Sequence, residues 1–152
     1  MENNFKIISI SCFSKEYIEL VNLISQKWGE SVDEINSISP AIVNIFVVTD
    51  NDNDNKVVGG TILCVTPKDA LCLAYILVNE NYFGKGIGTC LMKECIDFAC
   101  KEHPDKELQL LAEKWNDKTR KFYEKSGFVF RKEIPDYYPD HDRIACLYVY
   151  EK

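Results

Sequence analysis

The chain has 152 residues and a net charge of −6, with 46% hydrophobic and 28% charged residues. This length suits one domain over residues 1–152, and the composition excludes a largely disordered or membrane-embedded chain. The negative charge argues against nucleic acid as the main partner and weakly favours a cationic one, although a local basic patch could still hold an anion.

The first half of the chain predicts a strand, a helix, a polar segment and a hairpin. Ser14 is a plausible cap for the helix, whose apolar pattern breaks near Trp28. The polar segment is predicted as a loop or a short second helix that ends before Pro40. The expected ranges are 5–10 for the strand, 30–40 for the polar segment, and 42–48 and 57–65 for the hairpin strands.

The second half predicts alternating strands and helices. Residues 70–78 are apolar almost throughout, as in a central strand that is covered on both faces. A helix of about four turns follows and ends before Pro104. The remaining elements are a strand at 108–111, a helix at 118–126 and two closing strands at 128–130 and 144–150. We therefore expect an α+β, or mixed α/β, domain with helices on both faces of one sheet.

The cysteines and histidines offer no metal or redox motif. The seven cysteines lie in apolar stretches without a Cys-x-x-Cys pair, and the chain has two histidines. We therefore expect buried thiols and no metal. We recognise neither a secretory signal nor a membrane span in the sequence, so the expected compartment is the cytoplasm.

The most informative segment joins the apolar run 70–78 to the helix after it. Gly84, Gly86 and Gly88 alternate there, and glycines let backbone N–H groups approach an anion at the positive end of a helix. The expected ligand is a diphosphate. A helix entry without a ligand is the plainer alternative. A dinucleotide-binding fingerprint needs its third glycine one position beyond Gly88, so the spacing does not fit it. A Walker loop does not fit either, because Gly86 follows Lys85 where that loop has Ser or Thr.

A second motif follows one strand later, as Asn116-Asp117-Lys118-Thr119-Arg120-Lys121-Phe122-Tyr123-Glu124-Lys125-Ser126-Gly127-Phe128. With the glycine loop, it resembles the acetyl-CoA-binding core of the GNAT N-acetyltransferase superfamily, most strongly over residues 56–130. The resemblance implies the GNAT fold, a central and mostly antiparallel twisted sheet of about seven strands with a splayed central pair. It also implies acetyl-CoA as co-substrate, without a metal.

The resemblance assigns the cofactor contacts residue by residue. The end of the central strand would pair with the pantetheine arm, and the glycine loop would hold the pyrophosphate. Phe83 departs from the family, which usually has Arg or Gln there. Lys85 is as well explained as a solvated surface lysine, and Asn116 also as a helix cap. The implied cofactor residues are Ile76, Leu77, Val78, Phe83, Gly84, Lys85, Gly86, Ile87, Gly88, Thr89, Asn116, Thr119, Phe122 and Tyr123.

The resemblance makes Tyr123 the candidate general acid, which would protonate the departing thiolate. A core tyrosine is the alternative. The attacking amine must lose a proton, and the central strand offers no carboxylate for this. Glu113 is the substitute candidate and Glu80 a second one. For each of them a plain surface carboxylate is the favoured interpretation, and backbone-held water could act instead.

The acceptor side is less specific. Trp28 and Glu30 lie where the family commonly builds its acceptor wall, and Tyr75 and Tyr138 are further substrate-binding candidates. The Tyr137-Tyr138 pair resembles a hairpin of protein N-terminal acetyltransferases. The acceptor would be a protein or peptide α-amine or a small amine such as a polyamine, amino sugar or amino acid. The alternative function is a catalytically weak acyl-CoA-binding module, and either could be a monomer or a homodimer.

Overall fold

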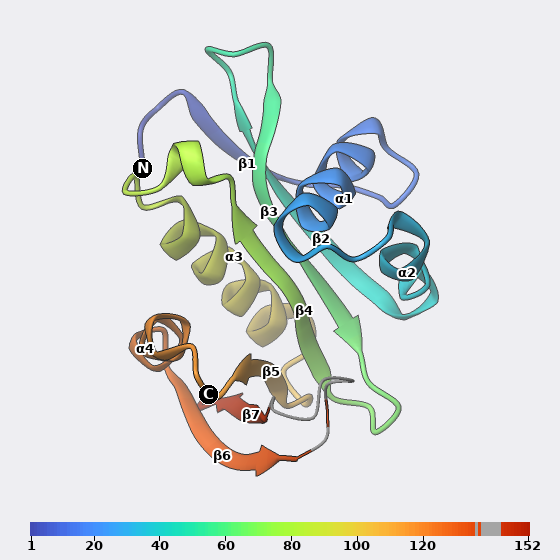
Figure 1. The fold of residues 1–152 in the computed structure, drawn as a ribbon, viewed down its shortest axis with the longest axis vertical. Coiled ribbons are helices and arrows are strands. Elements are labelled where there is room, and N and C mark those ends of the chain that lie inside the picture. The colour runs from blue at the N-terminus through green and yellow to red at the C-terminus, as the bar shows by residue number, and fades with distance from the viewer. Residues whose placement is uncertain (136, 138–143) are drawn as a thin grey trace.

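A computed structural model describes residues 1–135, 137 and 144–152 of the chain. Within these residues, seven strands form one sheet, with four α-helices and two short 3-10 helices between them (Figure 1). In chain order the elements are β1 (Phe5–Ser9), α1 (Lys15–Trp28), α2 (Val32–Asn36), η1 (Ser39–Ala41), β2 (Ile42–Asp50), β3 (Lys56–Val65), β4 (Leu71–Val78), η2 (Glu80–Tyr82), α3 (Ile87–Glu102), β5 (Leu108–Glu113), α4 (Asp117–Lys125), β6 (Phe128–Ile134) and β7 (Ala145–Tyr150).

The sheet has the strand order β1-β2-β3-β4-β5-β7-β6. Strands β4 and β5 are parallel neighbours, and every other neighbouring pair is antiparallel. A parallel pair needs a crossover connection, which α3 supplies. The predicted mixed α/β fold with a mostly antiparallel sheet is confirmed.

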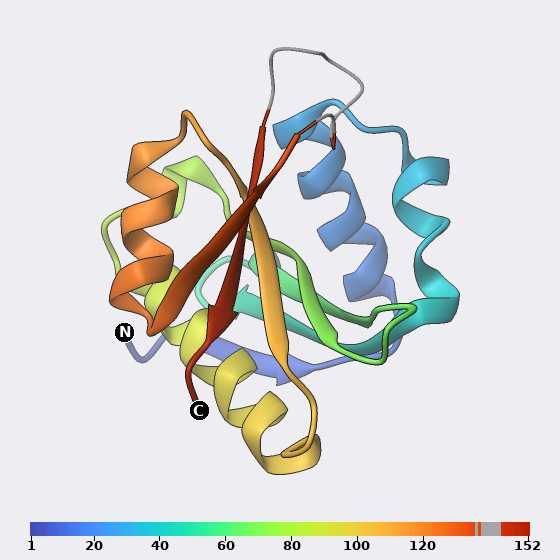
Figure 2. The same cartoon turned by 90° about the horizontal axis from the view of Figure 1, so that it is seen from below.

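The helices cover both faces of the sheet, α1 and α2 on one and α3 and α4 on the other (Figure 2). Helix α1 begins as predicted, because the Ser14 side chain accepts a hydrogen bond from the Tyr17 N–H. It ends at Gly29, whose φ of 74° lies in the left-handed region that glycine adopts without strain. The polar segment after it contains the short helix α2, which Ser31 caps through the Glu34 N–H.

A glycine in β3 sets how closely α1 packs on the sheet. A Cβ atom at Gly60 would lie 2.5 Å from the Phe46 carbonyl oxygen and 2.8 Å from Cδ1 of Leu20. Real Cβ atoms do not approach other atoms this closely, so a side chain here would push α1 or β2 away. Leu20 is fully buried in α1. The end of α1 lies near β4, where the ring centroids of Trp28 and Tyr75 are 5.7 Å apart.

Strands β4 and β5 part soon after they meet. Their pairing consists of Leu71 with Leu108 and Cys72 with Gln109 within the described chain. Further along β4, the Asn79 N–H donates to the Val58 carbonyl on the β3 side. Because successive residues of a strand point their backbone groups to opposite sides, the N–H of Val78 points away from β3, into the gap. The predicted splay of the central strand pair is confirmed.

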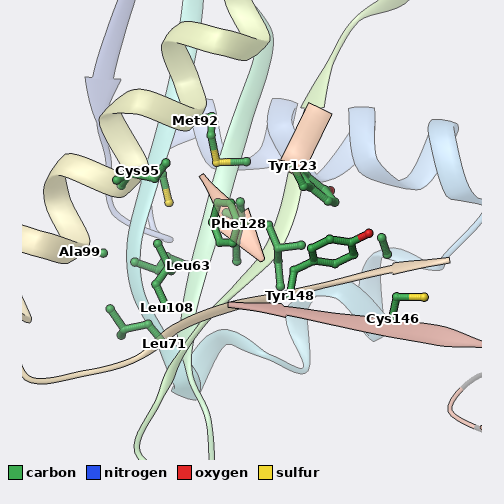
Figure 3. Packing of buried hydrophobic residues seen from close by; sticks show 14 residues of the cluster. Leu63, Leu71, Met92, Cys95, Ala99, Leu108, Tyr123, Phe128, Cys146 and Tyr148 are labelled. Atoms are coloured by element: carbon green, nitrogen blue, oxygen red, sulfur yellow. The ribbon is translucent and has the colours of Figure 1, made fainter. Parts of the chain in front are cut away.

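The core on the α3 and α4 side contains a group of aromatic rings (Figure 3). Tyr123 lies 6.3 Å from both Phe128 and Tyr148, measured between ring centroids. Phe128 and Tyr148 are almost fully buried. These contacts fix α4 against β6 and β7.

Two classes of feature are absent from the described residues. None of their helices is long and apolar enough to cross a membrane. In the same residues, no three His, Cys, Asp or Glu side chains gather as a metal site would require.

Candidate active site

A cavity of about 540 Å³ opens where β4 and β5 part. It lies between the free end of β4, the start of α3 and helix α4. Its lining contains every residue predicted for the cofactor except Lys85, and adds Lys27, Tyr82 and Lys118. The structure thus brings together two motifs that stand about 30 residues apart in the sequence.

The glycine loop turns sharply into α3. Gly84 and Gly86 have φ angles of 80° and 77°, which favour glycine, and Gly86 is the residue at which the helix begins. The first N–H groups of a helix have no partner within it, so those after Gly86 are available to an anion. A Cβ atom at Gly88 would lie 3.8 Å from Cγ2 of Val78 and 3.9 Å from Cζ of Phe122. Gly88 therefore lies close to both β4 and α4, with room for little more than a methyl group.

Asn116 and Thr119 form the start of α4 at the other side of the cavity. The Asn116 side-chain oxygen accepts a hydrogen bond from the Thr119 N–H at 3.3 Å, as a helix cap does. Both residues also line the cavity. The cap fixes the Asn116 side chain at the cavity wall.

Tyr123 lines the cavity from one turn further along α4 and is 8% exposed. Hydrogen bonds connect the helix that carries it to the neighbouring elements. Arg120 Nε donates to the Tyr148 hydroxyl at 2.8 Å, and that hydroxyl donates to Glu124 at 3.1 Å. Arg120 Nη1 also donates to the Lys114 carbonyl at 3.1 Å. These bonds tie α4 to β7 and to the end of β5.

The two carboxylates considered as bases lie outside the lining of this cavity. Glu113, at the end of β5, accepts a hydrogen bond from the Trp115 indole N–H. Glu80 is exposed in η2 and lines a neighbouring hollow of about 430 Å³. The structure therefore brings neither carboxylate to the wall that Tyr123 shares with the glycine loop.

Three of the predicted substrate-binding residues form one cluster on the α1 face. The Tyr75 hydroxyl donates to Glu30 Oε2 at 2.8 Å, and the Tyr75 and Trp28 ring centroids lie 5.7 Å apart. Burial raises the pKa of Tyr75, and the neighbouring Glu30 carboxylate raises it further. Tyr138, the fourth prediction, lies outside the described residues, whereas its neighbour Tyr137 is 53% exposed.

Sequence reasoning missed the three other residues of the lining. The Tyr82 hydroxyl donates to Asp50 at 2.9 Å, which holds its ring beside the loop. Lys118 lies in the first turn of α4, and Lys27 in the last turn of α1. The sequence held one signal for Lys27, because it directly precedes Trp28, which was predicted to bind substrate. Lys85 instead lies 3.4 Å from Glu2, measured between Nζ and Oε1.

Comparison with known families agrees with this geometry. The family model described as an acetyltransferase (GNAT) domain matches residues 42–130. This chain belongs to the GNAT acetyltransferase family. GNAT proteins are acetyl-CoA-dependent acetyltransferases, so the chain is assigned to this class of enzyme. The matched range contains the glycine loop and the whole of α4.

Several solved structures share this fold at low sequence identity. A GNAT family acetyltransferase from Elizabethkingia anophelis, with acetyl-CoA bound, has a TM-score of 0.80 at 18% identity, covering 99% of this chain and 100% of that one. The ribosomal-protein-S18-alanine N-acetyltransferase from Escherichia coli has 0.78 at 23%, covering 96% and 92%. A chain of the NatC complex bound to Gag peptide and CoA has 0.79 at 20%, covering 98% and 99%. No curated protein sequence matches the chain.

Proposed function

We propose that residues 1–152 act as one N-acetyltransferase domain that transfers acetyl from acetyl-CoA to a primary amine within a ternary complex. The observation that carries this proposal is the convergence of three elements on one cavity. These are the unpaired edge of β4, the N-terminus of α3 and the Asn116 to Tyr123 face of α4. A long ligand with an amide-bearing arm, a diphosphate and a thioester would match these three surfaces in turn.

The cofactor would bind chiefly through backbone groups. The diphosphate would accept hydrogen bonds from the first N–H groups of α3, helped by the helix dipole. The pantetheine arm would pair with the N–H of Val78 and, two residues earlier, Ile76, as an added strand does. The Asn116 oxygen already accepts from Thr119, so its side-chain NH₂ group would donate to the arm.

The reaction would proceed by direct attack. The amine nitrogen bonds to the thioester carbon, and the resulting tetrahedral intermediate collapses by breaking the carbon–sulfur bond. The Tyr123 hydroxyl would donate its proton to the departing thiolate, which leaves as the free thiol of CoA. The proton lost by the nitrogen would pass through water to a base, for which Glu113 and Glu80 stay candidates.

The acceptor would enter beside Trp28, Glu30 and Tyr75. A carboxylate held by a tyrosine hydroxyl is suited to bind a cationic amine before it loses its proton. One structural relative is named as a ribosomal-protein-S18-alanine N-acetyltransferase, and another is a complex bound to Gag peptide and CoA. Both names favour a protein or peptide α-amine as acceptor. A small amine fits the same cluster, so both classes belong in the test.

The test measures CoA binding and thiol release separately. Calorimetry with CoA establishes whether the cavity binds the cofactor. Thiol release from acetyl-CoA is then followed with pools of short peptides that differ in their first residue, and with pooled polyamines, amino sugars and amino acids. N-terminally blocked peptides serve as the control for an α-amine acceptor.

Each outcome has a distinct meaning. Release that requires a free amine supports the proposal, and loss of release with the blocked peptides identifies an α-amine. Lack of CoA binding contradicts the proposal at its first step. Tight CoA binding without release from any pool favours the second candidate, a catalytically weak acyl-CoA-binding module, which the uncharged Phe83 and the absence of a carboxylate on β4 also favour.

A further inference from the structure

The glycine loop brings little positive charge to the cavity. Phe83, the residue before it, is an uncharged ring that is 57% exposed. Lys85, within the loop, lies against Glu2 and does not line the cavity. The helix N-terminus supplies only partial charge. A diphosphate carries about two negative charges at neutral pH, so a cation from another element would complement it.

Lys27 of α1 brings a positive charge to this place. Its Nζ lies 6.0 Å from the centroid of the Phe83 ring and 5.1 Å from that of Trp28. It lines both the main cavity and the hollow of about 430 Å³ next to it. Within the described residues, no carboxylate forms an ion pair with it. The ammonium group therefore has ring contacts and space in front of it.

We propose that the Lys27 ammonium group binds the diphosphate of acyl-CoA, and so replaces from α1 a charge that the glycine loop lacks. This inference rests on the proposed function. The Phe83 ring would hold the ammonium by a cation–π contact and shield it from water on one side, which strengthens its attraction to phosphate. Partial burial lowers the pKa of Lys27, and a bound diphosphate would raise it again.

A structural role for Lys27 makes a different prediction. Lys27 lies in the last turn of α1, where a cation interacts favourably with the helix dipole without any ligand. Loss of that role would lower the stability of the protein. Such a loss of stability would affect the binding of ligands with and without a diphosphate to the same degree.

The test compares ligands and variants in one matrix. CoA, dephospho-CoA and pantetheine are titrated by calorimetry, pantetheine in competition with CoA, against wild type, Lys27→Met, Lys27→Arg and Lys15→Met. Lys15 is an exposed lysine at the opposite end of the same helix, about 18 Å away. We expect Lys27→Met to weaken CoA and dephospho-CoA alike by about 3- to 10-fold and to leave pantetheine unchanged. Lys27→Arg and Lys15→Met should bind as wild type does.

Three results would overturn the inference. One is unchanged CoA affinity in Lys27→Met. Another is an equal loss for pantetheine, which would indicate a structural role. The third is a loss for CoA that disappears with dephospho-CoA, which would place Lys27 at the 3′-phosphate. Failure of the wild-type protein to bind CoA would instead contradict the proposed function itself.

Discussion

Among the described residues, Tyr123 is the one ionisable side chain that lies both in the aromatic core and on the cavity wall. Its ring packs between Phe122, Phe128 and Tyr148 at centroid distances of 5.8 to 6.3 Å. Phenylalanine would keep this packing. The contribution of the hydroxyl group can therefore be separated from that of the ring.

We expect Tyr123→Phe to lower kcat by about 10²-fold, because the thiolate would leave without a proton donor. The KM for acetyl-CoA should change little, since the ring remains. Stopped assays of thiol release would measure both. Tyr150→Phe, which removes a hydroxyl from the same aromatic group outside the cavity lining, should keep wild-type kcat. A wild-type kcat in Tyr123→Phe would exclude the phenol as general acid.

Glu30 is expected to act on the acceptor rather than on the cofactor. Glu30→Gln should raise the KM for the amine by about 10-fold, through loss of a charge-assisted hydrogen bond, and leave the KM for acetyl-CoA unchanged. Initial rates with each substrate varied in turn would show this. The matched control is Glu34→Gln, a charge change on the exposed side of α2. Equal effects of the two variants would mean that Glu30 acts only through overall charge.

At the scale of elements, Gly60 is the point at which β3 limits its neighbours. Gly60→Ala should lower the free energy of unfolding by about 2 kcal/mol, because the added methyl would overlap Phe46 and Leu20. That corresponds to roughly 4–8 °C in the melting temperature. Gly88→Ala is the control, since its methyl meets ordinary contact distances. Similar melting temperatures for the two variants would show that α1 can shift without cost.

The order of elements could be predicted from sequence because each carries its own signal. Ser14 caps α1 through a residue three positions on, and the glycine loop and the α4 motif are each continuous in the chain. Contacts between distant residues carry no such signal. Glu30 and Tyr75 are 45 positions apart. Lys27 of α1 meets Phe83, which follows β4, across a still longer stretch of chain. The family resemblance therefore gave most of the cavity lining but missed Lys27, Tyr82 and Lys118.

At the scale of the whole molecule, buried thiols couple folding to alkaline pH. Burial raises the pKa of Cys64 from 9.0 to about 11 and that of Cys95 to about 12. The folded protein therefore retains these protons at a pH where the unfolded chain loses them. The contribution of these thiols to the free energy of unfolding is therefore fully present below pH 9. It falls as the pH rises above 9, by at most about 1.4 kcal/mol per pH unit for each thiol.

Urea unfolding between pH 8 and pH 11 would measure this dependence. Cys95→Ala removes one thiol, so its unfolding free energy should fall less steeply with pH than that of wild type. The difference between the two curves isolates Cys95 from other groups that titrate in the same range. Parallel curves would show that the Cys95 thiol ionises equally in both states.

The short pairing between β4 and β5 has a consequence for the whole catalytic cycle. In the part of the chain that the structure describes, two residue pairs join the half of the sheet made of β1 to β4 to the half made of β5 to β7. If the pantetheine arm occupies the gap as proposed, the acyl donor itself adds hydrogen bonds between these halves. The protein would then be stiffest when loaded with acyl donor and loosest after CoA departs. Mechanical rigidity would rise and fall with every turnover, and the supply of acyl donor would set how much of the population is in the stiffer, loaded state.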